Sequence, residues 1–252
     1  MRLTPGQRQE LLKKGFTRIP GGVGKTLIAA ALREVNNMIG LERGRASPKA
    51  DGGYDNKDYW TEKMGTPAIM DLLKESPASE LCEGLFGRGK VLPETKAQIA
   101  MRFPSLGNGR EPLHLHVDNL FYHGQAWRPP TGRIESFTLL VHVLLSDLPH
   151  GFSGNFAVSP GSHLLISDYI RRRGLGSFLT GSAKIRLPPA EQITGKAGDL
   201  VLCHYLAAHD RELNHSPHIR YAAFFRMKHS DHVARQIQAL SDPWMEWPGL
   251  RQ

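Results

Sequence analysis

The spacing of apolar residues divides this chain into a helix-rich first part and a strand-rich second part. Apolar side chains recur every three or four positions over residues 26–39, which predicts an amphipathic helix. Residues Thr4–Gln7 form a capping-box pattern that predicts an earlier helix, and Gly15 is suited to end it. A short strand over 16–19 should follow, and Thr66-Pro67 predicts the start of a further helix.

From Gln98 onward, short apolar runs alternate with turn residues, which is typical of strands. Few segments in this part are long enough for a helix, and 163–173 is the main candidate. The pattern predicts an antiparallel sandwich with the early helices packed outside it. The polar segment 41–65 reads as a long loop, either a lid over a site or a surface excursion. The predicted strands are 98–103, 113–119, 137–145, 155–158, 183–187, 200–204 and 221–227.

Composition is that of an ordinary folded domain, with 40% hydrophobic and 22% charged residues among 252. The two cysteines are far apart in sequence, which indicates a reducing, cytoplasmic setting rather than a disulfide scaffold. Residues 1–19 contain no apolar core of signal-peptide length, and the longest apolar run, 139–145, is too short to span a bilayer. We therefore expect a cytoplasmic protein without a membrane segment.

The formal net charge is +8, from 32 Lys and Arg against 24 Asp and Glu. Such a surface attracts anions, whether nucleic acid or a small anionic substrate. The basic residues are scattered, apart from Arg171–Arg173, and no nucleic-acid-binding motif accompanies them. We therefore expect a small-molecule substrate, an anionic one being favoured, and no nucleic-acid partner.

Two segments carry residues suited to bind a metal ion. His116 and Asp118 lie two positions apart in an alternating segment, and side chains so spaced on a strand project from one face. Further along, an apolar strand leads to His209, and Arg220 follows eleven residues later. Two imidazoles and one carboxylate leave coordination positions open, as suits iron(II) oxygenases. Arg220 adjoins an otherwise apolar strand, where a guanidinium needs a carboxylate partner such as the distal one of 2-oxoglutarate.

Further motifs accompany these residues in a fixed order along nearly the whole chain. Together they resemble the phytanoyl-CoA dioxygenase family of Fe(II)- and 2-oxoglutarate-dependent oxygenases. Each motif is short, but their combined order and spacing are specific. The matching segments are Leu3–Phe16, Gln98–Pro104, His116–Asp118, Val158–His163 and Gly198–Arg220.

The resemblance implies a double-stranded β-helix, or jelly roll, with iron at one mouth. Arg220 would form the salt bridge to 2-oxoglutarate. Gln98 and Arg102 share one face of the strand before the iron motif and would contact the co-substrate or the substrate. The implied Fe(II) ligands are His116, Asp118 and His209.

The resemblance also implies the reaction, in which 2-oxoglutarate and O2 are consumed, an unactivated C–H bond is hydroxylated, and succinate and CO2 are released. Related halogenases replace the ligand carboxylate with a small residue, so the presence of Asp118 favours hydroxylation. The chain would be one domain, 1–252. Its expected parts are a mainly helical flank over 1–95, the jelly-roll core over 96–228 and a C-terminal tail over 229–252.

Residues 20–26, PGGVGKT, support a rival hypothesis because they resemble the phosphate-binding loop of nucleotide-dependent ATPases. Ile19 stands where that loop requires its first glycine, and the alternating strands and helices of such a fold are missing from the pattern. We interpret the segment as a glycine-rich turn before the next helix. A jelly-roll binding module without turnover is a third hypothesis, and the complete set of ligand residues argues against it.

Overall fold

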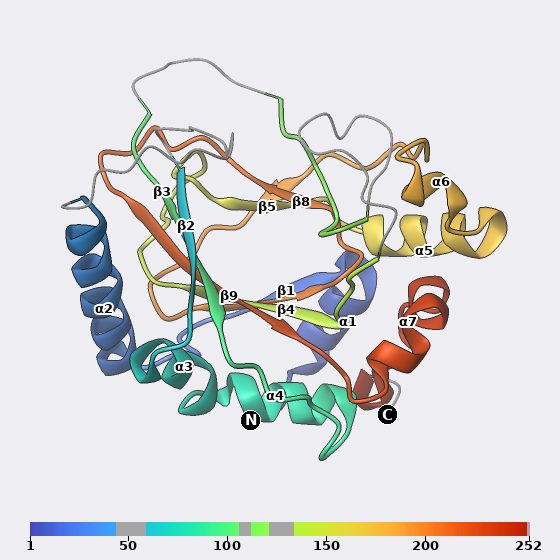
Figure 1. Cartoon of the computed structure of the whole chain (residues 1–252), viewed down its shortest axis with the longest axis horizontal. Helices are drawn as coiled ribbons and strands as arrows, with labels where there is room; N and C mark the ends of the chain where they lie inside the picture. Colours follow the sequence, from blue (N-terminus) through green and yellow to red (C-terminus); the bar gives the residue numbers. More distant parts are fainter. Residues whose placement is uncertain (44–58, 106–111, 121–133, 251–252) are drawn as a thin grey trace.

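Two facing antiparallel β-sheets with helices around them make up the fold (Figure 1). It is a computed structural model and describes residues 1–43, 59–105, 112–120 and 134–250. The larger sheet has the strand order β1-β7-β4-β9-β3-β2 and the smaller sheet the order β6-β5-β8. This arrangement confirms the predicted jelly-roll fold. The strands are β1 (Phe16–Ile19), β2 (Tyr59–Met64), β3 (Ala97–Arg102), β4 (Leu139–Leu144), β5 (Phe156–Val158), β6 (Glu191–Gln192), β7 (Leu200–His204), β8 (His209–Arg211) and β9 (Arg220–Met227).

The helices confirm the expected packing of the N-terminal part outside the sandwich. The first four helices contribute to one apolar core with the outer face of the larger sheet, and α5 and α6 lie beside the smaller sheet (Figure 1). Thr4 caps α1 through the predicted capping box, and Gly15 ends it with φ +84°. The helices are α1 (Pro5–Lys14), α2 (Lys25–Arg43), α3 (Pro67–Lys74), α4 (Pro77–Phe86), α5 (Ser162–Arg173), α6 (Gly176–Leu179), α7 (His232–Ser241) and the 3-10 helix η1 (Pro248–Leu250).

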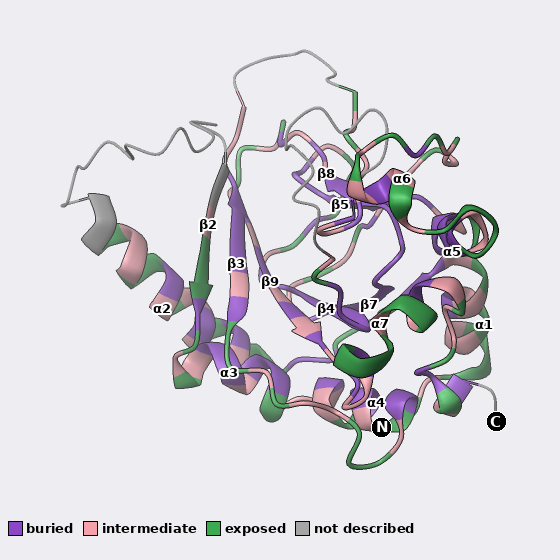
Figure 2. Ribbon diagram, turned by 45° about the vertical axis from the view of Figure 1, so that its right-hand side comes forward, coloured by how far each residue is buried: buried purple, intermediate pink, exposed green. Residues whose placement is uncertain are grey.

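Strand β4 lies at the centre of the larger sheet and is buried on both faces (Figure 2). Leu139, Val141 and Val143 belong to the core shared with the outer helices. Leu140 and Leu144 point the other way, into a second core between the two sheets. Because alternate residues of a strand face opposite sides, His142 also faces this inner space. The site described below lies in the same space.

The predicted loop at 41–65 and two predicted strands need correction. Residues 59–64 form β2, which pairs with β3 at the edge of the larger sheet, while 44–58 lie outside the described residues. The polar side chains of β2, such as the exposed Glu62, belong to an edge strand with one face open to solvent. No strand forms over 183–187, and 113–119 contains only isolated bridges and a turn.

The glycine-rich segment 20–26 forms a turn whose backbone N–H groups donate to acceptors of the same chain. The Gly21 N–H donates to Oδ1 of Asp199 at 2.8 Å, and the Val23 N–H donates to the Gly198 carbonyl at 2.8 Å. A Cβ at Gly22 would come within 2.6 Å of the buried Leu200 side chain. These contacts favour the turn interpretation, because two amide groups of the segment, those of Gly21 and Val23, are already bonded to the protein's own acceptors. None of the helices over the described residues combines the length and apolarity needed to cross a bilayer.

Candidate active site

Two histidines that lie far apart in sequence are placed opposite each other by their own main chains. The His116 N–H donates to the His209 carbonyl at 2.9 Å, and the His209 N–H donates to the His116 carbonyl at 2.8 Å. This isolated antiparallel bridge brings the two imidazole rings to a centroid distance of 4.7 Å. The main chain therefore fixes the separation of the two side chains before any ion is considered.

Asp118 reaches the same point from a tight turn rather than from a strand. The Leu120 N–H donates to the Val117 carbonyl at 3.1 Å, and Asn119 within this turn adopts φ +56°, in the left-handed region. The buried Tyr205 hydroxyl donates to the Asp118 carbonyl at 2.8 Å and anchors the turn. The three side chains thus meet as the sequence predicted, although the turn replaces the predicted strand.

The polar atoms that converge between these side chains are all acceptors. Nε2 of His116 lies 3.7 Å from Oδ1 of Asp118, and Nε2 of His209 lies 3.8 Å from the same oxygen. The other ring nitrogens face carbonyls, with Nδ1 of His209 2.9 Å from Ala207 O and Nδ1 of His116 3.3 Å from His114 O. A carbonyl only accepts, so each Nδ1 carries the proton and each Nε2 has a lone pair directed at the centre. Three such ligand atoms within 4.8 Å of one another fit a divalent cation.

The electrostatics of the cluster keep these groups in the form that binds metal. Burial lowers the pKa of His209 to about 4, with a further contribution from His116. Burial also lowers the pKa of His116 and outweighs the opposing effect of Asp118. For Asp118, burial raises the pKa, but Arg226 and the two histidines together outweigh it and hold the pKa at about 2. At neutral pH the cluster therefore presents two neutral imidazoles and one carboxylate.

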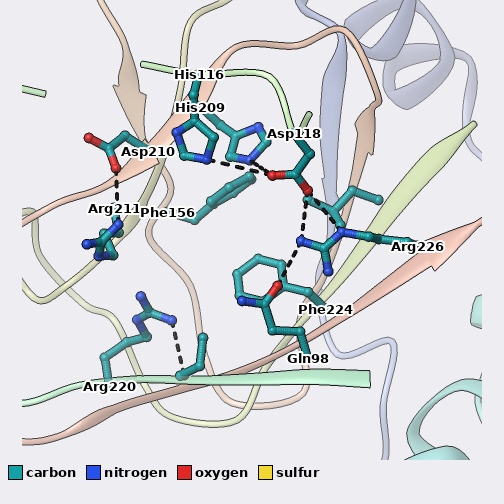
Figure 3. Close-up of a pocket in the computed structure, with 12 residues that line it drawn as sticks. Gln98, His116, Asp118, Phe156, His209, Asp210, Arg211, Arg220, Phe224 and Arg226 are labelled. Atoms are coloured by element: carbon teal, nitrogen blue, oxygen red, sulfur yellow. Dashed lines mark hydrogen bonds and ion pairs between the residues drawn. The ribbon is translucent and has the colours of Figure 1, made fainter. Parts of the chain in front are cut away.

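Arg226 on β9 holds the outer oxygen of that carboxylate. Its Nε and Nη2 lie 2.9 and 2.8 Å from Oδ2 of Asp118, which leaves Oδ1 directed at the histidines. Nη2 also donates to Oε1 of Gln98 at 2.7 Å, and Nε2 of Gln98 donates to the Thr61 hydroxyl at 3.0 Å. A row of hydrogen bonds thus runs from the edge strand β2 across the sheet to Asp118, and Figure 3 shows the part from Gln98 through Arg226 to Asp118.

Arg220 lies on the same face of β9 at the opposite end of the cavity. It is 3% exposed, its Nε donates to the Gly154 carbonyl at 2.8 Å, and its Nη1 donates to the Ala100 carbonyl at 3.2 Å. These bonds fix the guanidinium while it still lines the pocket. Arg102 is paired with Arg220 in the β3–β9 register and is buried, but it does not line the pocket.

The pocket between the sheets opens to solvent, and its empty space, open solvent included, amounts to about 490 Å³. The histidines and Asp118 form one wall, and arginine side chains approach from other sides (Figure 3). The apolar wall consists of Ala100, Leu140, Phe156 and Phe224. A metal-binding wall beside fixed cations and an apolar surface can hold an ion, an anionic ligand and a carbon skeleton together.

Residues 12–222 match the family model for phytanoyl-CoA dioxygenase (PhyH). The chain belongs to the phytanoyl-CoA dioxygenase family. It is accordingly a 2-oxoglutarate-dependent non-haem iron enzyme, as its sequence motifs predicted. No curated protein matches this family member at a significant level of sequence similarity.

Solved structures share the fold of this family member. The non-heme alpha ketoglutarate dependent carbocyclase SnoK from nogalamycin biosynthesis has a TM-score of 0.60 and 19% identity, with 92% of this chain and 90% of SnoK covered. HygX from Streptomyces hygroscopicus, solved with nickel, 2-oxoglutarate and hygromycin B, has a TM-score of 0.58 and 16% identity, covering 90% and 88%. The epimerase SnoN, in complex with Fe3+, alpha ketoglutarate and nogalamycin RO, has a TM-score of 0.58 and 20% identity, covering 88% and 82%.

Arg226 and Arg211 are two pocket cations of this PhyH family member that were not predicted from the sequence. Arg226 stands six positions after Arg220, so the two lie on the same face of one strand, and period-two counting from Arg220 would have found it. Arg211 stands two positions after His209 on β8, and the same counting applies.

Proposed function

We propose that the protein is an Fe(II)- and 2-oxoglutarate-dependent dioxygenase that hydroxylates an unactivated C–H bond of a small-molecule substrate and releases succinate and CO2. Its iron ligands would be Nε2 of His116, Oδ1 of Asp118 and Nε2 of His209. The observation that carries this proposal is the convergence of these three acceptors, with no proton donor among them, in a chain of the PhyH family. Two neutral imidazoles and a carboxylate are the ligand set that suits non-haem Fe(II).

Arg220 is the proposed partner of the distal carboxylate of 2-oxoglutarate. Its guanidinium is buried, fixed by two backbone carbonyls and placed across the pocket from the metal cluster. A fixed guanidinium pairs well with a carboxylate because both groups are planar and their hydrogen-bonding atoms match. Gln98 lines the pocket and accepts a hydrogen bond from Arg226. A contact between Gln98 and the co-substrate remains a prediction. For Arg102 we propose only a supporting place beside Arg220.

Iron and 2-oxoglutarate together supply the oxidising chemistry, by activating O2 as the keto acid loses CO2. The chain's own residues would place and protect that chemistry. His116, Asp118 and His209 would hold the iron through three ligand atoms, a set that leaves room for the co-substrate to bind. Phe156 and Phe224 would keep the carbon skeleton of the substrate in an apolar environment and exclude water. HygX and SnoN were solved with small molecules bound, which supports a substrate of that class.

The test measures metal binding and succinate formation in single alanine variants of His116, Asp118 and His209. Each variant should lose Fe(II)-dependent conversion of 2-oxoglutarate, because two remaining ligands hold the ion poorly. His218→Ala is a matched control, since His218 is exposed on the loop before β9. Retained turnover in two of the three variants would refute the assignment. Failure of the wild type to convert 2-oxoglutarate with iron present would instead favour a binding module.

A second experiment tests Arg220 separately from the metal. Arg220→Ala should keep metal binding but require far more 2-oxoglutarate for half-maximal turnover, since the counter-charge for the carboxylate is gone. Arg172→Gln is the control, because Arg172 lies on α5 with its side chain 72% exposed. An unchanged 2-oxoglutarate requirement in Arg220→Ala would move this role to another cation.

A further inference from the structure

The central strand β4 contains a single polar residue, His142, in an otherwise apolar sequence. Its side chain is 1% exposed and faces the space between the sheets, as Leu140 and Leu144 do on either side of it. Among the described residues, neither ring nitrogen of His142 has a hydrogen-bond partner. Burying a polar group without a partner costs free energy, and an apolar side chain at this position would avoid that cost.

His142 lies directly behind the apolar wall of the pocket. It is paired with Phe224 in the β4–β9 register, and Phe224 stands between Arg220 and Arg226 on one face of β9. The imidazole stacks on Phe224 at a centroid distance of 4.3 Å and meets Phe156 edge to face at 5.2 Å. Both phenyl rings line the pocket (Figure 3). His142 is therefore placed beside the span where 2-oxoglutarate is proposed to lie.

The imidazole of His142 is neutral, so it has one N–H donor. Burial lowers the pKa of His142 well below its ordinary value, and Arg220 and His209 lower it further. The influence of these two residues agrees with a position near both ends of the proposed ligand site. Stacking on Phe224 occupies a face of the imidazole, whereas the ring nitrogens lie at its edge and point away from that contact.

Both nitrogens are shielded from solvent, so a ligand reaches them only when a neighbouring ring shifts. Phe156 is 4% exposed and belongs to the core between the sheets. Phe224 is only partly buried and packs against that core from the pocket side. Phe224 is therefore the ring that can give way when a ligand enters.

We propose that His142 donates a hydrogen bond to the distal carboxylate of 2-oxoglutarate once the ring of Phe224 shifts to admit this ligand. The inference rests on the function proposed above and adds a co-substrate-binding residue to the same site. A carboxylate has more acceptor positions than one guanidinium fills, so Arg220 and His142 can bind the same group. The bond gives the buried imidazole the partner that it otherwise lacks.

The experiment measures 2-oxoglutarate binding by calorimetry, with Mn(II) as the metal and without oxygen, so that no turnover occurs. His142→Phe keeps an aromatic ring but has no N–H. It should bind 2-oxoglutarate about tenfold or more weakly than wild type, as expected for the loss of a hydrogen bond to a charged group. Its Mn(II) affinity, and its melting temperature without 2-oxoglutarate, should not fall. His218→Phe, on the exposed loop before β9, is the matched control and should bind like wild type.

Two further variants separate the effect of the N–H group from that of ring shape. Asparagine places its amide close to the position of Nδ1, and glutamine places its amide close to that of Nε2. One of His142→Asn and His142→Gln should therefore bind 2-oxoglutarate more tightly than His142→Phe does. Which of the two does so identifies the nitrogen that carries the proton.

Equal 2-oxoglutarate affinity of wild type and His142→Phe overturns the proposal. Equal weakening in all three variants overturns it as well, because ring shape rather than the N–H group would then be responsible. Failure of wild type with Mn(II) to bind 2-oxoglutarate is a different result. It refutes the proposed oxygenase function itself.

Discussion

Replacement of Arg226 by glutamine tests whether the outer oxygen of Asp118 must be held for the inner oxygen to bind metal. Arg226 bonds Oδ2 of Asp118 through two nitrogens at 2.9 and 2.8 Å, and it opposes the effect of burial on the pKa of that carboxyl. Glutamine keeps much of the length of the side chain but removes its charge. The Asp118 side chain should then rotate more freely, and its pKa should rise from about 2.

The expected magnitude follows from two separate considerations. A hydrogen bond to a charged group contributes about 1.5–3 kcal/mol, and because Arg226 is 32% exposed, we expect the lower end. Loss of a residue that orients a metal ligand typically weakens binding about 10–100-fold. Since tenfold corresponds to about 1.4 kcal/mol, the two considerations agree on a loss of roughly tenfold in metal affinity.

The assay is a Mn(II) titration of wild type and Arg226→Gln at several pH values. A carboxyl with a lowered pKa stays charged until the pH falls toward that pKa, so wild-type affinity should respond little to Asp118 protonation near neutral pH. The variant, with the higher pKa, should lose affinity at a higher pH than wild type. Arg18→Gln is a matched control, because Arg18 pairs with the buried Asp199 on the same sheet, outside the pocket. Wild-type affinity in Arg226→Gln across this range would show that the guanidinium does not orient the ligand.

Three further predictions concern stability. Burial lowers the pKa of His163 to about 4 and that of His204 to about 3. As the pH drops from 6.5 toward these values, the unfolded chain takes up protons before the folded one, so the free energy of unfolding should fall. Urea unfolding curves that do not change over this pH range would contradict this prediction. Gly22→Ala should cost about 1–3 kcal/mol through its clash in the turn, whereas Gly24→Ala, with open space around it, should change little; equal melting temperatures would refute the packing role. His142 is 1% exposed, and neither of its ring nitrogens has a hydrogen-bond partner among the described residues. The substitution His142→Phe should therefore raise the free energy of unfolding by about 1 kcal/mol. A lowered melting temperature of this variant would indicate that the imidazole has a ligand.

The sequence predicted the outline of the fold because its strongest patterns are local. The capping box at Thr4 and the apolar spacing of 26–39 correspond to α1 and α2. The weak points were segments whose structure depends on distant partners. The strand over 59–64 is polar because it lies at an edge, and only its pairing with β3 identifies it. The predicted strand over 113–119 failed because its main chain pairs only at isolated bridges.

The three metal-ligand candidates were identified from the sequence, but their geometry was not predictable from spacing alone. Side-chain alternation suggested that His116 and Asp118 share a strand face, whereas the turn at Asn119 and the Tyr205 hydroxyl place Asp118. Counting along β9 from Arg220 places Arg226 on the pocket face, but no local pattern shows that it supports Asp118, which lies more than a hundred positions away. Such support becomes visible only when the strands are in register.

The reciprocal backbone pairing of His116 and His209 also bears on the order in which folding and metal loading occur. In small zinc-dependent domains the ligands come together only when the ion arrives, so chelators unfold them. Here the backbone hydrogen bonds between His116 and His209 hold the two segments together. The entropy cost of bringing these remote segments together is therefore met during folding rather than on metal binding. The ion therefore meets a preorganised receptor. Chelation should lower the melting temperature only by the mass-action contribution of the lost ligand and leave the backbone at the site intact.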